Sequence, residues 1–198
     1  MTSAELRGLT SASEYLAREL VSEVRHEYVG GHVYPLPGGT TTHSRVAAAL
    51  CGLFDTRLRG NPCESFGCVK KVRVRTPRDT RFYYPDAMVV CRPMPPESES
   101  QDEPVVIAEV LAAATRRIDE VEKRDAYLTI PTLMAYLLVE TEGPGVVVDR
   151  RAKREDRFDM EVYDGLDAVI PLPAIGADVR LAELYARVKF CDEAGATA

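Results

Sequence analysis

Two short apolar segments, each carrying a single carboxylate, constrain the fold of this chain more than any other feature of its sequence. The segments span residues 83–90 and 104–111, and both are rich in the β-branched residues typical of buried strands. Asp86 lies in the first segment and Glu109 in the second. A buried carboxylate is costly unless it is paired or bound to a metal ion, so each of these residues needs a partner. Two carboxylates on neighbouring strands would bind a hard divalent cation such as Mg²⁺, whereas the alternative is that each one pairs with an Arg or Lys inside the sheet.

The length and composition indicate one ordinary globular domain. With 198 residues, 45% of them hydrophobic and 28% charged, the chain can build one core. We expect this core to cover about residues 11–150, with a peripheral hairpin and a C-terminal helix in residues 151–198. The first residues contain no basic segment followed by an apolar one, and no apolar run reaches membrane-spanning length, so neither a signal peptide nor a membrane span is predicted.

The cysteines indicate a reducing compartment. There are five, an odd number, and none forms a CxxC pair: Cys51, Cys63, Cys68, Cys91 and Cys191. A disulfide framework or a zinc site would need paired or clustered cysteines. We therefore predict five reduced thiols in a cytoplasmic protein.

The net charge of −6 argues against a protein that coats nucleic acid through bulk electrostatics, yet the charge is unevenly distributed. Residues 57–81 hold eight bases and two acids, a local excess of +6, which leaves −12 on the remainder. Within this segment residues 69–76 alternate as a strand does, with Val72 and Val74 on one face and Lys71, Arg73 and Arg75 on the other. Such a basic face would contact the phosphate backbone of DNA, although a merely solvated strand face gives the same pattern.

The remaining segments alternate between helical and extended patterns. A capping box from Ser11 to Glu14 predicts a helix to about Leu20, and the pair Gly30-Gly31 predicts a tight hairpin over residues 26–36. Apolar residues at core-facing spacing predict a helix over residues 43–59. Farther along, we expect a loop at 92–103, a helix at 115–129, a strand at 133–139, a hairpin pair at 146–149 and 158–163, and a terminal helix at 178–190. This order predicts an α/β fold with a mixed central β-sheet flanked by helices.

The order and spacing of several motifs resemble those of one nuclease family. Pro85-Asp86, followed 23 positions later by Glu109-Val-Leu111, has the arrangement of the PD-(D/E)XK nucleases. Together with Arg25-His-Glu-Tyr-Val-Gly-Gly31 and His43, this chain resembles the Uma-two family of restriction-endonuclease-like proteins, a branch of that superfamily. The downstream part of the match comprises Thr115, Asp119, Lys123, Tyr127, Pro131 and residues 136–139. The resemblance implies a restriction-endonuclease-like core.

The resemblance also implies a role for each residue of this site. Asp86 and Glu109, with the carbonyl of Val110, would bind Mg²⁺ or Mn²⁺ as the cofactor, and Glu27 would be a further contact to metal or water. Leu111 stands where the motif has its Lys, so Lys123 from the following helix would supply the ammonium that positions the attacking water. His43 would reach a phosphate. Asp119, Lys123 and Tyr127 are four residues apart, so they share one helix face.

Each of these assignments has a structural alternative. Asp119 and Lys123 could form a solvent-facing ion pair of small energetic value, Glu27 could be a surface carboxylate, and His43 could cap or pack its helix. The chain also departs from the family pattern, because Ala112-Ala-Ala114 replaces hydroxyl-bearing residues and Val69 replaces a polar position.

We predict from these observations a Mg²⁺-dependent endonuclease that hydrolyses phosphodiester bonds in DNA. The alternative is a catalytically decayed nuclease-fold module that binds DNA or protein, and hydrolysis of a small phosphorylated molecule also stays open. The resemblance suggests a homodimer, and no membrane partner is expected.

Overall fold

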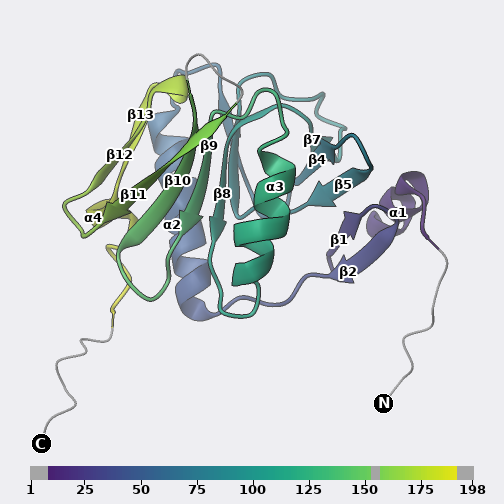
Figure 1. The fold of residues 1–198 in the computed structure, drawn as a ribbon, viewed down its shortest axis with the longest axis horizontal. Helices are drawn as coiled ribbons and strands as arrows, with labels where there is room; N and C mark the ends of the chain where they lie inside the picture. The colour runs from purple at the N-terminus through teal and green to yellow at the C-terminus, as the bar shows by residue number, and fades with distance from the viewer. Residues whose placement is uncertain (1–8, 153–156, 191–198) are drawn as a thin grey trace, which may run out of the picture.

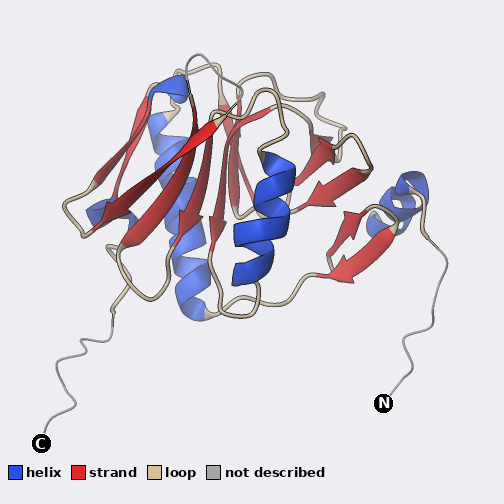
Figure 2. Cartoon of the chain, in the orientation of Figure 1, coloured by secondary structure: helices blue, strands red, loops and turns tan. Residues whose placement is uncertain are grey.

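A six-stranded mixed β-sheet forms the centre of the molecule, which we describe from a computed structural model covering residues 9–152 and 157–190. Its strand order is β11-β10-β9-β8-β6-β3, and Figure 1 labels the first four of these strands. Strands β8 and β9 run parallel, and the other neighbouring pairs are antiparallel. Helices lie on both sides of this sheet, as the blue ribbons of Figure 2 show. The predicted α/β fold with a mixed central sheet is therefore confirmed.

Five of the six strands coincide with segments that the sequence predicts to be extended. The full set is β3 (Glu64–Gly67), β6 (Ala87–Val90), β8 (Pro104–Val110), β9 (Ala135–Val139), β10 (Gly145–Arg151) and β11 (Phe158–Asp164). The exception is β3, whose four residues include a Ser and a Gly and carry little strand propensity. The hairpin predicted to be peripheral is formed by β10 and β11, but β10 pairs with β9 and so belongs to the central sheet.

The two faces of the sheet carry separate hydrophobic cores. Helix α2 (Thr41–Arg57) packs on one face through Val46, Leu50 and Phe54, as its predicted apolar spacing requires. The opposite face is covered by the helical segment from residue 118 to 127. Strand β8 serves both cores, because Ala108 and Val110 point to the α2 side and Ile107 points to the other. None of the helices in the described part of the chain is long and apolar enough to span a membrane.

The helix predicted over residues 115–129 is not a regular α-helix. Its first part, Ile118–Lys123 (η1), is a π-helix, and only α3 (Arg124–Tyr127) has α-helical hydrogen bonding. A π-helix is rare and commonly marks a functional site. Both Asp119 and Lys123 are buried in this segment, so the unusual winding lies where the sequence predicts catalytic residues.

A second, smaller sheet lies beside the first, with strand order β2-β1-β5-β4-β7. Its strands are β1 (His26–Val29), β2 (His32–Pro35), β4 (Lys71–Arg75), β5 (Thr80–Tyr83) and β7 (Ser100–Gln101). The predicted hairpin around Gly30-Gly31 is confirmed as β1 and β2, and both glycines have positive φ angles that favour glycine. Helix α1 (Ala12–Glu19) begins with the predicted capping box and packs Tyr15 against Tyr28 and Phe82.

The chain passes from the small sheet to the central sheet through Tyr84, Pro85 and Asp86. The sequence predicts one continuous strand here, whereas the structure has two, β5 in the small sheet and β6 in the central sheet. Pro85 explains the break, because proline has no N–H with which to continue a strand ladder. Asp86 therefore lies at the junction of the two sheets.

The C-terminal part differs most from the sequence prediction. In place of a helix over 178–190, β13 (Ala177–Arg180) pairs with β12 (Val169–Leu172), and a short 3₁₀-helix η2 (Pro173–Ile175) joins them. Only α4 (Leu181–Leu184) is helical. The apolar residues that suggested a long helix do reach the α2-side core, but the strand pairing satisfies the backbone instead.

The prediction that every cysteine is reduced is wrong for one pair. Cys63 and Cys91 form a disulfide, with their Cα atoms 3.8 Å apart. The antiparallel pairing of Glu64 with Val90 places these two flanking residues opposite one another, a proximity that their sequence separation of 28 does not reveal. Cys51 and Cys68 are free thiols, and Cys191 lies outside the described residues.

Candidate active site

Asp86 and Glu109 lie opposite one another at the junction of the two sheets. Strands β6 and β8 are antiparallel with Ala87 paired to Ala108, so the next step of the same register places Asp86 across from Glu109. We call these two residues the carboxylate pair. Like charges directly across a strand pair repel each other, so this arrangement calls for a neutralising cation.

Asp86 is held in place by the backbone of the neighbouring strand and by helix α2. The N–H of Val110 donates a 2.8 Å hydrogen bond to Asp86 Oδ2, and His43 Nε2 lies 3.2 Å from the same oxygen. The hydrogen bond to Asp86 raises the pKa of His43 above its ordinary value despite partial burial. His43 was predicted to reach a phosphate, and the structure places it in the first turn of α2 against Asp86, where it also lines the cavity described below.

Glu109 is almost completely buried and is held by two donors from the helical segment. Its Oε1 atom accepts a 2.9 Å hydrogen bond from the Tyr127 hydroxyl and lies 3.2 Å from Lys123 Nζ. Burial raises the pKa of Glu109 well above its ordinary value, and nearby carboxylates add to the shift, although Lys123 opposes it. The ionised form of Glu109 is therefore unfavourable in free energy unless a cation compensates its charge.

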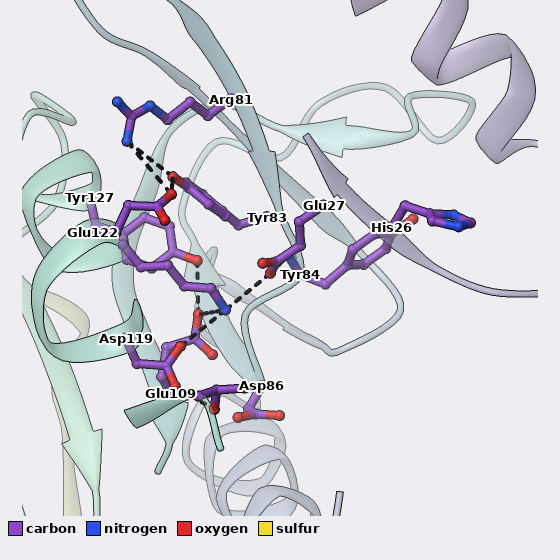
Figure 3. A network of polar contacts seen from close by, with 12 residues as sticks. His26, Glu27, Arg81, Tyr83, Tyr84, Asp86, Glu109, Asp119, Glu122 and Tyr127 are labelled. Carbon is purple, nitrogen blue, oxygen red and sulfur yellow. Dashed lines mark hydrogen bonds and ion pairs between the residues drawn. The ribbon is translucent and has the colours of Figure 1, made fainter. Parts of the chain in front are cut away.

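Lys123 is the cation at the centre of the site. Its Nζ atom lies 3.0 Å from Glu27 Oε1, 3.2 Å from Glu109 Oε1 and 3.2 Å from Asp119 Oδ1. Figure 3 shows how the three carboxylate side chains converge from different elements of the fold. Burial alone would lower the pKa of Lys123, but these carboxylates raise it well above its ordinary value, so the ammonium stays charged.

The placement of Asp119 and Lys123 rules out the solvent-facing ion pair that the sequence left open. Both residues are buried, and the Thr115 hydroxyl donates a 2.9 Å hydrogen bond to Asp119 Oδ2. Burial raises the pKa of Asp119, as it does for Glu109. The hydroxyl of Tyr136 donates to the backbone carbonyl of Asp119, which fixes the first turn of η1 against β9.

The spacing of Asp119, Lys123 and Tyr127 predicts a shared helix face, and the structure brings all three to the site. The hydrogen bond from Tyr127 to Glu109 was not predicted from the sequence. The signal for it was present, since a tyrosine one turn beyond two charged residues on a core-facing helix needs a buried acceptor for its hydroxyl.

The carboxylates of the site outnumber its cations. Three carboxylates, those of Glu27, Glu109 and Asp119, surround the single ammonium of Lys123, and the fourth, Asp86, lies against His43, the only other basic side chain in contact with these carboxylates among the described residues. We call these four carboxylates and Lys123 the site cluster. With all carboxylates ionised, the cluster carries −3 before His43 is counted, so a divalent cation would bring it close to neutrality.

The donor set at the carboxylate pair fits Mg²⁺ or Mn²⁺. Mg²⁺ is commonly bound through one or two carboxylates and keeps several waters, so Asp86, Glu109 and the Val110 carbonyl would suffice. Over residues 9–152 and 157–190, no three His, Cys, Asp or Glu side chains come together as a ready-made metal cage. Glu27, which the sequence suggested as a further ligand, instead accepts hydrogen bonds from Lys123 and from the Tyr84 N–H. Its place in the structure is thus beside the ammonium.

A cavity of about 660 Å³ opens directly onto these groups. Its floor is formed by Asp86, Glu109, Asp119 and Lys123, and its sides by helix α2 and by the segments that flank the β1–β2 hairpin. Ala112 lines it where the family pattern has a hydroxyl, so this part of the wall is apolar. The volume is large enough for a phosphate group with an adjoining sugar or base.

The basic strand β4 does not present three free cations as its sequence suggested. Lys71 is only 5% exposed, pairs with Glu99 at 3.2 Å and lies between the rings of Tyr15 and Tyr84. Arg73 and Arg75 both bind one carboxylate, that of Asp102. These acids come from the predicted loop at 92–103, which contributes strand β7 beside β4. Lys71 therefore cannot meet a DNA backbone, and the charges of Arg73 and Arg75 are partly cancelled.

The fold and the site define a mixed α/β protein with a carboxylate pair and a buried lysine at the junction of two sheets. Comparison with protein families identifies it further, since residues 12–182 match the model of the Uma2 family, described as "Putative restriction endonuclease". The chain belongs to the Uma2 family, and the predicted resemblance is confirmed.

Individual proteins are also similar to this chain. "Uncharacterized protein sll1609" of Synechocystis sp. is 30% identical over 135 residues, which cover 67% of this chain and 75% of that protein. "Uncharacterized protein slr1290" of the same organism is 31% identical over 147 residues, covering 74% and 75%. Among solved structures, a protein from Anabaena variabilis described as "a putative nuclease belonging to DUF820" superposes with a TM-score of 0.67 at 17% identity, covering 88% of this chain and 96% of that one. At this identity the superposition establishes the fold alone.

Proposed function

We propose that this protein is a metal-dependent nuclease that hydrolyses phosphodiester bonds in DNA. The observation that carries the proposal is the excess of carboxylates over cations at the floor of the cavity, where Asp86 and Glu109 face each other beside Lys123. The descriptions of the Uma2 family and of the Anabaena protein support a nuclease-like activity. A buried, uncompensated anionic cluster in a cleft is also the arrangement expected of a functional site.

Each residue of the site has a separate role in the proposed hydrolysis of a phosphodiester bond. When bound at the carboxylate pair, a divalent cation supplies Lewis-acid polarisation of the phosphate and activation of water. Asp86, fixed by the Val110 N–H, and Glu109, fixed by Tyr127, hold their carboxylates in a set orientation before substrate arrives. His43 lines the cavity from α2 and can donate a hydrogen bond to a phosphate oxygen or to the leaving group.

Lys123 is assigned an electrostatic role. It lines the cavity while its ammonium contacts Glu27, Glu109 and Asp119. If one N–H of the Lys123 ammonium gives up its contact with Glu109, it can point to the attacking water or to a phosphate oxygen in the cavity. An ammonium in this position stabilises developing negative charge. Glu27 and Asp119 keep the ammonium charged and in place throughout.

A second candidate function is supported by the same contacts. An ammonium has three donors, and all three donors of Lys123 face carboxylates, so none is left for a substrate. With Ala112 in place of a hydroxyl, this favours a nuclease fold that has lost catalysis and serves as a DNA- or protein-binding module.

One experiment separates the two candidates. The purified protein is incubated with supercoiled plasmid in Mg²⁺, in Mn²⁺ and in EDTA, and Mn²⁺ binding is measured by calorimetry. The nuclease requires Mn²⁺ binding and nicking or linearisation that EDTA and Asp86→Asn both abolish. Absence of both metal binding and cleavage would leave the binding module as the function.

A further inference from the structure

The β1–β2 hairpin directs two aromatic rings toward the active-site side of the molecule. In its register Tyr34 pairs with Glu27, and His32 pairs with Val29. Directly paired residues of antiparallel strands share one face, so Tyr34 and His32 lie on the same face as Glu27. The Glu27 carboxylate reaches Lys123 in the site cluster. The other face of β1 carries Tyr28, which is buried against Tyr15 of α1.

The rings on the site-facing side are exposed, although their neighbours on β1 are not. All four residues of β2 are exposed, and Tyr34 retains 53% of its accessible surface. The ring centroids of His32 and Tyr34 are 6.4 Å apart with a 38° tilt between planes, so the two rings lie next to each other on this face. Strand β2 is also an edge of the small sheet, and Figure 1 shows it with β1 and α1 at one side of the molecule.

The hairpin is continuous with the cavity wall. Arg25 precedes β1 and lines the cavity, and residues 36–39, which follow β2, line it as well. The N–H of Leu36 donates to the carbonyl of Arg25, which closes the base of the hairpin beside the cavity. Tyr34 lies two residues before Leu36, so its exposed side chain is on the strand that leads directly into the cavity wall.

The net charge of the protein disfavours an intact DNA duplex as the ligand of this surface. The net charge is −6, and the cations of the basic strand are occupied by Glu99 and Asp102. Affinity for duplex DNA depends chiefly on many free cations along the phosphate backbone. Affinity for unpaired bases depends instead on stacking with exposed aromatic rings.

We propose that Tyr34 and His32 form a stacking platform for unpaired bases, and that the DNA bound at this site is single-stranded or locally unpaired. The inference rests on the proposed function for the identity of the polymer as DNA, and it adds the structural class of the substrate. Arg25, exposed at the cavity wall with its guanidinium 5.9 Å from the Tyr84 ring, would contact the adjoining phosphate.

Binding measured without cleavage tests this platform. Fluorescence anisotropy in EDTA would compare a labelled oligothymidylate with the duplex formed by that strand and its oligoadenylate complement. We expect the single strand to bind more tightly, and Tyr34→Leu to weaken it by roughly tenfold at every salt concentration. Tyr34→Phe should retain the affinity because the ring remains. Met160→Ala, which removes a 68% exposed side chain from the edge strand β11, is the matched control and should change nothing.

Arg25→Gln provides an independent arm of the same experiment. Removal of one phosphate contact should flatten the salt dependence of single-strand binding by about 0.7 in log–log slope, whereas Tyr34→Leu should leave the slope unchanged. The two variants therefore separate stacking from charge. Circular dichroism confirms that each variant is folded.

Two results overturn the stacking platform: duplex bound as tightly as the single strand, or an unchanged affinity in Tyr34→Leu. Because the assay contains no metal, the failure of this inference differs from the failure of the nuclease. If the protein cleaves plasmid but its DNA binding does not depend on Tyr34, the proposed nuclease function stands and the stacking platform is excluded. If single-strand binding depends on Tyr34 but no DNA is cleaved, the stacking platform stands and the proposed nuclease function is excluded.

Discussion

The site cluster and the basic strand β4 are both dense groups of charged side chains, but they differ in how their charges balance. On β4 three cations meet the carboxylates of Glu99 and Asp102, the two residues that flank strand β7. In the site cluster three carboxylates share the ammonium of Lys123, and the fourth, Asp86, has only His43 beside it. The first group is therefore close to balanced at a partly exposed surface, whereas the second has a large anionic excess in a buried place.

This contrast shows where a ligand is needed. A group of charges with partners inside the fold is explained by the fold, and its loss affects mainly local structure. A buried anionic excess is unfavourable until something cationic binds, so it is retained where binding or catalysis requires it. Charge density along the sequence does not separate the two cases, because partners are assigned only by tertiary structure.

The largest expected effect comes from neutralising the carboxylate pair. Asp86→Asn or Glu109→Gln should abolish Mn²⁺ binding in calorimetry and reduce DNA cleavage by at least about a hundredfold. The metal-free variants should be as stable as the wild type or more stable, since a like-charge repulsion is removed. Asp102→Asn, which removes the carboxylate that pairs with Arg73 and Arg75 of β4, is the control and should cleave normally. Variants that unfold readily would show instead that these carboxylates are structural ion-pair partners.

Removal of the central cation should destabilise the protein strongly. Lys123→Met leaves three buried carboxylates without their ammonium, and we expect a loss of about 3–5 kcal/mol in the free energy of unfolding. Lys71→Met is the matched control, because Lys71 is also buried but pairs with the carboxylate of Glu99, which can turn to water. Urea titrations of both variants would measure the difference. Equal losses would mean that the charge imbalance has no energetic significance.

A smaller effect is expected from the hydroxyl that holds Glu109. Tyr127→Phe removes one hydrogen bond and keeps the ring, so Mn²⁺ affinity should fall by about 0.5–1.5 kcal/mol. Tyr136→Phe also removes a buried hydroxyl, but this hydroxyl donates to the backbone carbonyl of Asp119. Tyr136→Phe should therefore lower the Mn²⁺ affinity less than Tyr127→Phe does. Calorimetry with Mn²⁺ on both variants compares them directly. A greater loss of affinity in Tyr136→Phe would contradict the role given to Tyr127.

The smallest effect should come from the exposed end of the basic strand. Arg75 shares Asp102 with Arg73, and its side chain is 59% exposed. Arg75→Gln should change DNA affinity by less than about threefold and leave stability nearly unaltered, because exposed ion pairs contribute little. Fluorescence anisotropy titrations at several salt concentrations would measure this change in DNA affinity. A pronounced flattening of the salt slope would show that β4 meets phosphate after all.

The sequence is sufficient for those parts of the fold that local patterns determine. The capping box at Ser11, the Gly30-Gly31 turn and the apolar spacing of α2 each specify an element through contacts within a few residues. The apolar, β-branched run of residues 104–111 likewise predicts the buried strand β8. The division of residues 83–90 between two sheets was missed, since only the tertiary path of the chain separates the strand before Pro85 from the one after it.

The candidate site follows the same rule. Asp86, Glu109 and Lys123 could be selected from motif order, and the structure places all three together. Glu27 and Lys71 could not be placed, because each is paired with a residue far away in sequence, Lys123 and Glu99 respectively. The disulfide between Cys63 and Cys91 was missed for the same reason.

The π-helical winding of Ile118–Lys123 makes the length of this segment a determinant of the site. A helix closed by i→i+5 hydrogen bonds takes more residues per turn than the about 3.6 of an α-helix, so the winding of this segment sets how Lys123 is turned relative to the carboxylates around it. Deletion of a single residue at the exposed Val121 would allow regular α-helical winding and rotate the ammonium away from Glu109 without changing any charged side chain. Among related chains, a one-residue gap in this segment would therefore disconnect the lysine from the carboxylate pair even where every residue of the motif is retained.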